Sequence, residues 1–235
     1  MLLSVLLTIF STTAMDGTIW TFPFFSEQVV KNNVTTIFPM CIVLIAGYII
    51  AREEKDNALK NIMVIPVSYS CLLSGKLVAC ALLSLFLGLA SAVFTIAASL
   101  LLEFPGFSVA VVIQTFIQMI LNCLFLYIAV TPVIALTVRI PNGHLIGTII
   151  AFVYGYGGMF ASGNMTLANV YPITASLGLI RYRSYDPAVH WNMLSCLCSL
   201  FLCVCISCIF ILRIKNKEPE RTTKKPDKAI LKKGW

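Results

Sequence analysis

Long uncharged, apolar stretches recur along the chain, separated by short polar segments. A helix needs about 20 apolar residues to cross the hydrocarbon core of a bilayer, and several of these stretches reach that length. None alternates apolar and polar residues in ten-residue units, as the strands of a membrane barrel do. We therefore predict an all-α integral membrane protein, because helices satisfy their own backbone hydrogen bonds in lipid. The simplest partition gives six transmembrane helices, at about 1–15, 33–51, 70–102, 108–138, 144–162 and 192–213.

The two ends of the chain depart from this regular pattern. Residues 1–15 are apolar but shorter than a full span, with no basic residue before them. We interpret them as a short first spanning helix; a cleaved signal peptide and a start inside a longer natural chain are the alternatives. The predicted transmembrane domain covers residues 1–213. Residues 214–235 are basic and polar, which predicts a disordered tail.

Composition narrows the class of protein. Of the 235 residues, 59% are hydrophobic and 11% are charged, and the mean hydropathy is +0.91. Soluble domains have about 45–50% apolar and about 25% charged residues. The composition therefore excludes a disordered chain, a small disulfide-stapled protein and almost any soluble enzyme.

Lysine and arginine are distributed unevenly between the predicted loops. Short cytoplasmic loops of membrane proteins carry an excess of basic residues. If the 52–70 segment is cytoplasmic, 14 of the 17 basic residues lie inside, and the three outside are Lys31, Arg181 and Arg183. This orientation places both termini in the cytoplasm. The net charge of +7 then reflects topology rather than a nucleic-acid partner, and the lysines of the tail are expected to contact anionic membrane lipid.

Motifs for catalysis and metal binding are missing from the sequence. It contains no GxxxxGK[ST] phosphate loop, no HExxH and no GxSxG, so we expect no ATPase site and no catalytic residues in this chain. The nine cysteines lie in or beside predicted spans, which favours packing over a metal site. Glu53-Glu54 resembles the glutamate pair of CAAX-type membrane proteases, but Ala58 stands where that motif has arginine. An intramembrane hydrolase is therefore the weakest hypothesis.

Polar amides recur on one face of the 108–138 span. Gln114, Gln118 and Asn122 are four residues apart, so they share a helical face. Amides inside a membrane usually face other helices or a cavity. One interpretation is a wall of a substrate pathway, and the other is hydrogen bonding between helices.

The connection before the last span is long and half apolar. Residues 164–190 are expected to return partly into the bilayer or to pack on its outer surface, so we predict a partly re-entrant outer loop. Glycines at 155, 157 and 158 precede it, where they either allow close helix approach or break the helix. Arg181 and Arg183 follow it. One interpretation is a solvated pair at the level of the lipid headgroups, and the other is a contact with lipid phosphates or an anionic substrate.

The segment between the second and third predicted spans is charged and amphipathic. Residues 56–64 can form a short helix whose apolar side chains, Leu59, Ile62 and Met63, share one face. Pro66 favours an extended residue before it and so ends the helix. On spacing alone, this element either only anchors the loop at the interface or receives a push from a cytosolic partner.

A family resemblance bears on this choice. The sequence REEKDNALKNIMVIPVS at residues 52–68, followed by Lys76, resembles the signature of ABC-2 type permeases, E-x-x-x-x-T-L-K-N-[IL]-L-x-[IL]-P-[IV]-S-R with a lysine further on. It is most similar to the six-span bacitracin and lantibiotic self-protection permeases of Gram-positive bacteria. Ala58 and Tyr69 replace the usual Thr and Arg. In that family a basic amphipathic segment usually precedes the first span, whereas the sequence here opens directly in apolar residues.

The resemblance implies a function and a set of partners. In that family the segment after the second span forms a coupling helix, which fits into a cleft of a separate ATPase subunit. It implies a permease subunit in the bacterial plasma membrane, paired with a second copy or a sister permease, that exports an antimicrobial peptide, lantibiotic or lipid-like antibiotic. ATP and Mg would be bound by the partner ATPase, with no cofactor in this chain. A non-transporting sensor or accessory subunit is the alternative. The predicted ATPase-coupling residues are Arg52, Glu53, Glu54, Asp56, Leu59, Lys60, Asn61 and Pro66.

Overall fold

The computed structural model describes residues 2–13, 21–55, 69–137, 140 and 143–214. Over these residues the secondary structure is helical and contains no strand. One short π-helix interrupts the first long helical segment. The elements are α1 (Leu2–Thr13), α2 (Phe22–Asn32), η1 (Asn33–Ile37, the π-helix), α3 (Phe38–Lys55), α5 (Tyr69–Leu101), α6 (Val109–Thr137), α7 (Gly143–Ala161), α8 (Met165–Val170), α9 (Pro172–Leu179) and α10 (Met193–Ile214).

Five helical segments within the described residues are long and apolar enough to cross a membrane. Four of them, α5, α6, α7 and α10, match the predicted spans at 70–102, 108–138, 144–162 and 192–213 within a few residues. The agreement follows from the sequence, because each segment lies in a run without acidic residues that is long enough to span the hydrocarbon core. The protein is therefore a multi-pass, all-α membrane protein.

The other two predicted spans differ from the observed helices. The span expected at 33–51 begins at Phe22 and continues to Ile50 through α2, η1 and α3. Pro23 lies in the first turn of α2, where its missing N–H costs no hydrogen bond, so the helix starts there despite Glu27 and Lys31. The span expected at 1–15 corresponds to α1, whose 12 residues reach only about 18 Å at 1.5 Å per residue. A sixth span therefore stays a prediction.

Helix α6 forms the centre of the bundle. It contacts α3, α5, α7, α9 and α10, and its Leu126, Val130 and Ile134 are fully buried. These side chains belong to the same core as Val34 and Val43 from the first long span. The outer faces of α5, α7 and α10 carry exposed large apolar side chains, as expected for helices that face lipid.

Small residues allow α7 to lie close to its neighbours. Gly143, Gly147, Ala151, Gly155 and Gly158 are all buried on one face of this helix. A Cβ added to Gly155 would lie 2.7 Å from the Thr35 carbonyl oxygen, and one added to Gly158 would lie 2.9 Å from Ile173 Cγ2. The glycines therefore serve close approach to η1 and α9, and α7 continues unbroken to Ala161.

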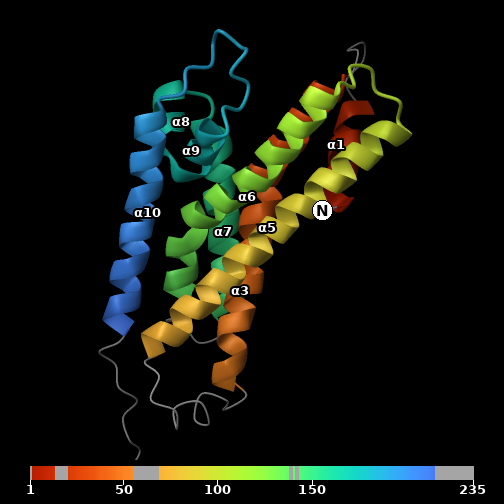
Figure 1. The fold of residues 1–235 in the computed structure, drawn as a ribbon. Helices are drawn as coiled ribbons and strands as arrows, with labels where there is room; N and C mark the ends of the chain where they lie inside the picture. The colour runs from red at the N-terminus through yellow and green to blue at the C-terminus, as the bar shows by residue number, and fades with distance from the viewer. Residues whose placement is uncertain (1, 14–20, 56–68, 138–139, 141–142, 215–235) are drawn as a thin grey trace, which may run out of the picture.

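The bundle has two distinct ends (Figure 1). Helices α8 and α9 lie at one end, beside the segment that leads into α10. The last turn of α3, the first turn of α5 and the end of α10 lie at the other. This arrangement places Arg52 and Lys55 opposite Arg181 and Arg183, as the predicted topology requires. Which end faces the cytoplasm stays a prediction.

Candidate functional site

The predicted ATPase-coupling segment begins at the end of α3. The backbone of Arg52, Glu53 and Glu54 is helical there, and α5 resumes at Tyr69 after the segment. The remaining predicted residues lie outside the described part of the chain, so the short coupling helix and its contacts stay a prediction. These residues are Asp56, Leu59, Lys60, Asn61 and Pro66.

Two of the three residues in the predicted polar stripe of α6 contact α9 or the residue that ends it. Asn122 is 1% exposed, and its Oδ1 accepts a hydrogen bond of 3.4 Å from Ser176 of α9. Gln118 is half-buried and donates from Nε2 to the Ile180 carbonyl at 3.0 Å. Gln114 is exposed. Gln118 and Asn122 thus hold α9 against α6, while a role in a substrate pathway stays a prediction for all three.

The C-terminus of α9 ends in a backbone turn that fixes the following loop. Arg181 has a φ of 54° and lies in the left-handed region. Its N–H donates to the Gly178 carbonyl at 3.0 Å, and the N–H of Tyr182 donates to the Leu177 carbonyl at 3.1 Å. This pair of bonds is the Schellman motif, which usually has glycine where Arg181 stands. Two otherwise unpaired helix carbonyls are thereby satisfied, and the chain turns sharply towards α2.

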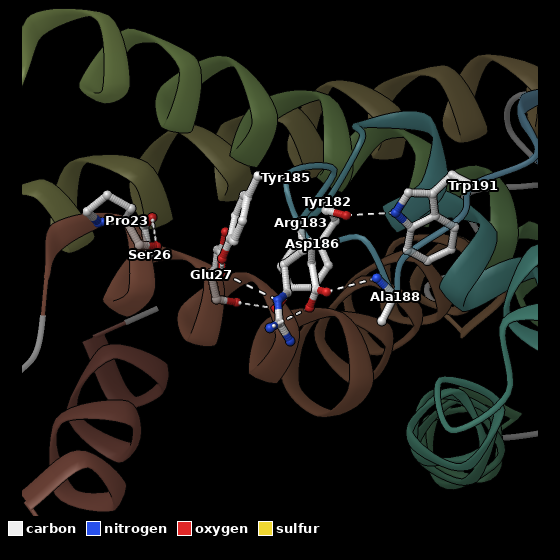
Figure 2. A network of polar contacts seen from close by, with 9 residues as sticks. All are labelled: Pro23, Ser26, Glu27, Tyr182, Arg183, Tyr185, Asp186, Ala188 and Trp191. Atoms are coloured by element: carbon white, nitrogen blue, oxygen red, sulfur yellow. Dashed lines mark hydrogen bonds and ion pairs between the residues drawn. The ribbon is translucent and has the colours of Figure 1, made fainter. Parts of the chain in front are cut away.

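A charged cluster joins this loop to α2 (Figure 2). The Tyr185 hydroxyl donates to Glu27 Oε2 at 2.8 Å, and Arg183 Nε lies 3.8 Å from the same oxygen. Arg183 Nη2 also pairs with Asp186 Oδ2 at 3.1 Å. Arg183 therefore neutralises carboxylates of its own chain. A further contact of Arg181 or Arg183 with lipid phosphates or an anionic substrate stays a prediction.

Two aromatic residues brace the cluster. Tyr182 donates its hydroxyl to the Glu27 backbone carbonyl at 3.2 Å. Trp191 Nε1 in turn donates to the Tyr182 carbonyl at 2.7 Å, which ties the start of the loop to its end. Partial burial of the Tyr185 phenol raises its pKa, and the hydrogen bond to the Glu27 carboxylate raises it further by a smaller amount. The phenol therefore remains a proton donor at neutral pH.

Glu27 is the functional candidate that the sequence interpretation missed. It is an acidic residue inside an apolar helix that counts towards a membrane span, and such residues usually have a specific partner. Its side chain is 16% exposed. The signal was present in the sequence, but its partners lie more than 150 residues away and no local pattern points to them. Among the described residues, no group of three His, Cys, Asp or Glu side chains could hold a metal ion.

The arrangement provides fixed attachment rather than reactive groups. One end of the bundle carries a short helical cap tied to α6 by amides and to α2 by a charged cluster. The other end carries two helices, α3 and α5, that flank the charged segment.

Comparisons with known proteins identify the family. A family model described as ABC-2 family transporter protein matches residues 1–158, which is more than half of the chain. The chain is also 32% identical over 121 residues to the bacitracin transport permease protein BCRB of Bacillus licheniformis. That alignment covers 50% of this chain and 58% of the relative, so it spans little more than half of the relative's length. No solved structure matches the chain significantly. The chain belongs to the ABC-2 family of transporter proteins, and its similarity points to the bacitracin permease branch.

Proposed function

We propose that this chain is the membrane permease subunit of an ATP-driven ABC exporter, which removes an antimicrobial peptide, lantibiotic or lipid-like antibiotic from the cell that makes or meets it. The observation that carries the proposal is the similarity to a bacitracin transport permease protein within the ABC-2 family. The signature at residues 52–68 adds support from the chain's own sequence. The exporter lies in the bacterial plasma membrane with both termini in the cytoplasm.

Energy enters through a separate ATPase subunit. ATP and Mg bind to that partner, and its closure moves the segment between α3 and α5. Because these two helices flank the segment directly, its displacement tilts them together. A cargo site between this permease and a second copy, or a sister permease, then opens outward. Such a cycle requires that the cargo bind the two states with different affinity.

Substitutions in the coupling segment test this proposal. The chain is co-expressed with its cognate ATPase, and the ATPase activity of the purified membrane complex is measured. Glu54→Ala and Leu59→Asp are expected to lower that activity, because they alter the charge and the apolar face of the coupling helix. Glu103→Ala, an acidic residue in the α5–α6 connection, is the control and should leave it unchanged. Wild-type activity in both coupling variants would contradict the coupling role.

A non-transporting sensor or accessory subunit is the alternative outcome of the same experiment. A wild-type chain that co-purifies with no ATPase, and whose gene has no ATPase gene beside it, would support this alternative. An intramembrane hydrolase would instead show activity that requires Glu53 or Glu54 and no ATPase.

A further inference from the structure

The first long span is not one regular helix. Between α2 and α3, residues Asn33–Ile37 form a π-turn, and the Phe38 N–H donates to the Asn33 carbonyl five residues back. Pro39 explains why the turn widens here. It supplies no N–H for the Thr35 carbonyl, and in a regular α-helix its ring would press on that oxygen. A π-turn holds one residue more than an α-turn and moves this carbonyl aside.

Space for the displaced carbonyl comes from α7. A Cβ on Gly155 would lie 2.7 Å from the Thr35 oxygen and 2.9 Å from Pro39 Cγ, so a larger residue would collide with the turn. Proline alone does not produce this feature. Pro132 lies inside α6, and α6 remains α-helical through it. The π-turn thus depends on a proline and on a glycine in a neighbouring helix.

The side of the turn that faces α5 is polar and incompletely bonded. Asn33 is 2% exposed, and its Nδ2 donates to Ser91 Oγ at 2.9 Å. Its Oδ1 is buried with no hydrogen-bond partner. A buried acceptor without a partner is costly, so its presence at this position needs a physical explanation.

The two halves of the span are held by different parts of the molecule. The outer half, α2, is fixed to loops: the Phe22 N–H donates to the Pro105 carbonyl at 2.9 Å, the Phe25 ring lies 5.1 Å from that of Phe104, and Glu27 is bound by the loop after α9. The inner half, α3, packs mainly on α7, and α5 and α6 contact both halves. A Cβ on Gly47 would lie 2.9 Å from His144 Cβ, which shows how closely these helices approach.

We propose that the π-turn at Asn33–Ile37 is a joint, about which α3 and the end of α7 near Gly143 move together, while α2 and the other end of α7, which packs on α9, stay in place. The inference rests on the proposed function, because only in an ATP-driven permease must α3, which leads into the coupling segment, move. A π-turn suits this role, since π-segments and irregular turns inside helices are recurrent sites of hinge motion. The outer cap would then remain closed on α2 while the inner half responds to the ATPase.

Distance measurements in the whole chain test the joint. Nitroxide-bearing non-natural residues at Tyr48 of α3 and at Lys31 of α2 are each paired with one at Phe201 of α10, and the nine native cysteines remain in place. Double electron–electron resonance is recorded in lipid vesicles. A joint predicts that the Tyr48–Phe201 distribution is broader than the Lys31–Phe201 distribution. Two distance distributions of equal width, measured before the π-turn is altered, would overturn the proposal.

A straightened variant sharpens the test. Deletion of Thr36 together with Pro39→Ala removes the extra residue and the proline, so a continuous α-helix forms with both faces in register. This change should narrow the Tyr48–Phe201 distribution to the width of the outer pair. Pro132→Ala is the matched control and should leave that distribution unchanged. An unchanged width in the straightened variant, or the same narrowing in the control, would contradict the joint.

The distance measurements test the joint independently of the proposed function. The distance distributions need neither an ATPase nor a cargo, so they decide the joint even if no transport is found. When the straightened variant is expressed with its ATPase, it should insert into the membrane normally, and the cells should lose resistance to the exported antibiotic. Full resistance in a straightened variant with a narrowed distribution would show that transport does not use the joint.

Discussion

Replacing Glu27 by Gln and Tyr185 by Phe tests whether a charged hydrogen bond fixes the outer loop to α2. The Tyr185 hydroxyl lies 2.8 Å from Glu27 Oε2. Hydrogen bonds to charged groups contribute about 1.5–3 kcal/mol to stability. Water competes here because Tyr185 is 69% exposed, so we expect the lower end of that range. The ion pair with Arg183, at 3.8 Å, adds about 0.2–1 kcal/mol in the exposed case.

A double-mutant cycle isolates the contact from these other terms. Glu27→Gln keeps the side-chain volume and removes the charge, while Tyr185→Phe keeps the ring and removes the donor. The free energy of unfolding in detergent is followed through Trp191 fluorescence, with Trp20 and Trp235 replaced by Phe. We expect each single variant to lose about 1–2 kcal/mol. The coupling should be about 1 kcal/mol, less than the full charged bond, because the glutamine amide can still accept a weaker neutral bond from the Tyr185 hydroxyl. A coupling below about 0.3 kcal/mol, which is the scatter of independent sites, would refute the reasoning.

Two further pairs of substitutions, each a test and its control, probe the packing of α9 on α7 and α6. Gly158→Val places a side chain 2.9 Å from Ile173 Cγ2, so it should cost about 1–3 kcal/mol of stability, as overpacked cores do. Gly75→Val meets no atom within 4 Å at its Cβ and should change the unfolding transition little; equal losses in the two variants would contradict the close packing of α7 on α9. Gln118→Leu removes the bond to the end of α9 and should cost about 0.6 kcal/mol, whereas Gln114→Leu should be neutral. A larger loss at Gln114 would contradict the positions of these amides.

Four of the six predicted spans could be located from the sequence because their signal is local. A run without acidic residues that is long enough to span the hydrocarbon core locates α5, α6, α7 and α10 within a few residues. The first long span was placed too late because Glu27 and Lys31 look like loop residues. Glu27 is accommodated by Arg183 and Tyr185, and a contact across more than 150 residues leaves no trace in local periodicity.

The candidate sites divide in the same way. Four-residue spacing correctly places Gln118 and Asn122 on one face of α6, but only the tertiary structure identifies Ser176 and the Ile180 carbonyl as their partners. The π-turn depends on Pro39, which is visible in the sequence, and on Gly155 of another helix. Residues 56–68 lie outside the described part of the chain, so the coupling segment rests on its amphipathic spacing and its family signature.

ATP-dependent export by the reconstituted complex tests the central proposal most directly. The chain and its ATPase are placed in lipid vesicles with a fluorescent peptide antibiotic, and movement of the peptide across the bilayer is followed after ATP is added. We expect transport that needs ATP, that is lost when the phosphate-binding lysine of the ATPase is replaced, and that falls with Glu54→Ala. The same rate of peptide movement with the inactive ATPase would contradict the assignment of this chain as the permease of an ATP-driven exporter.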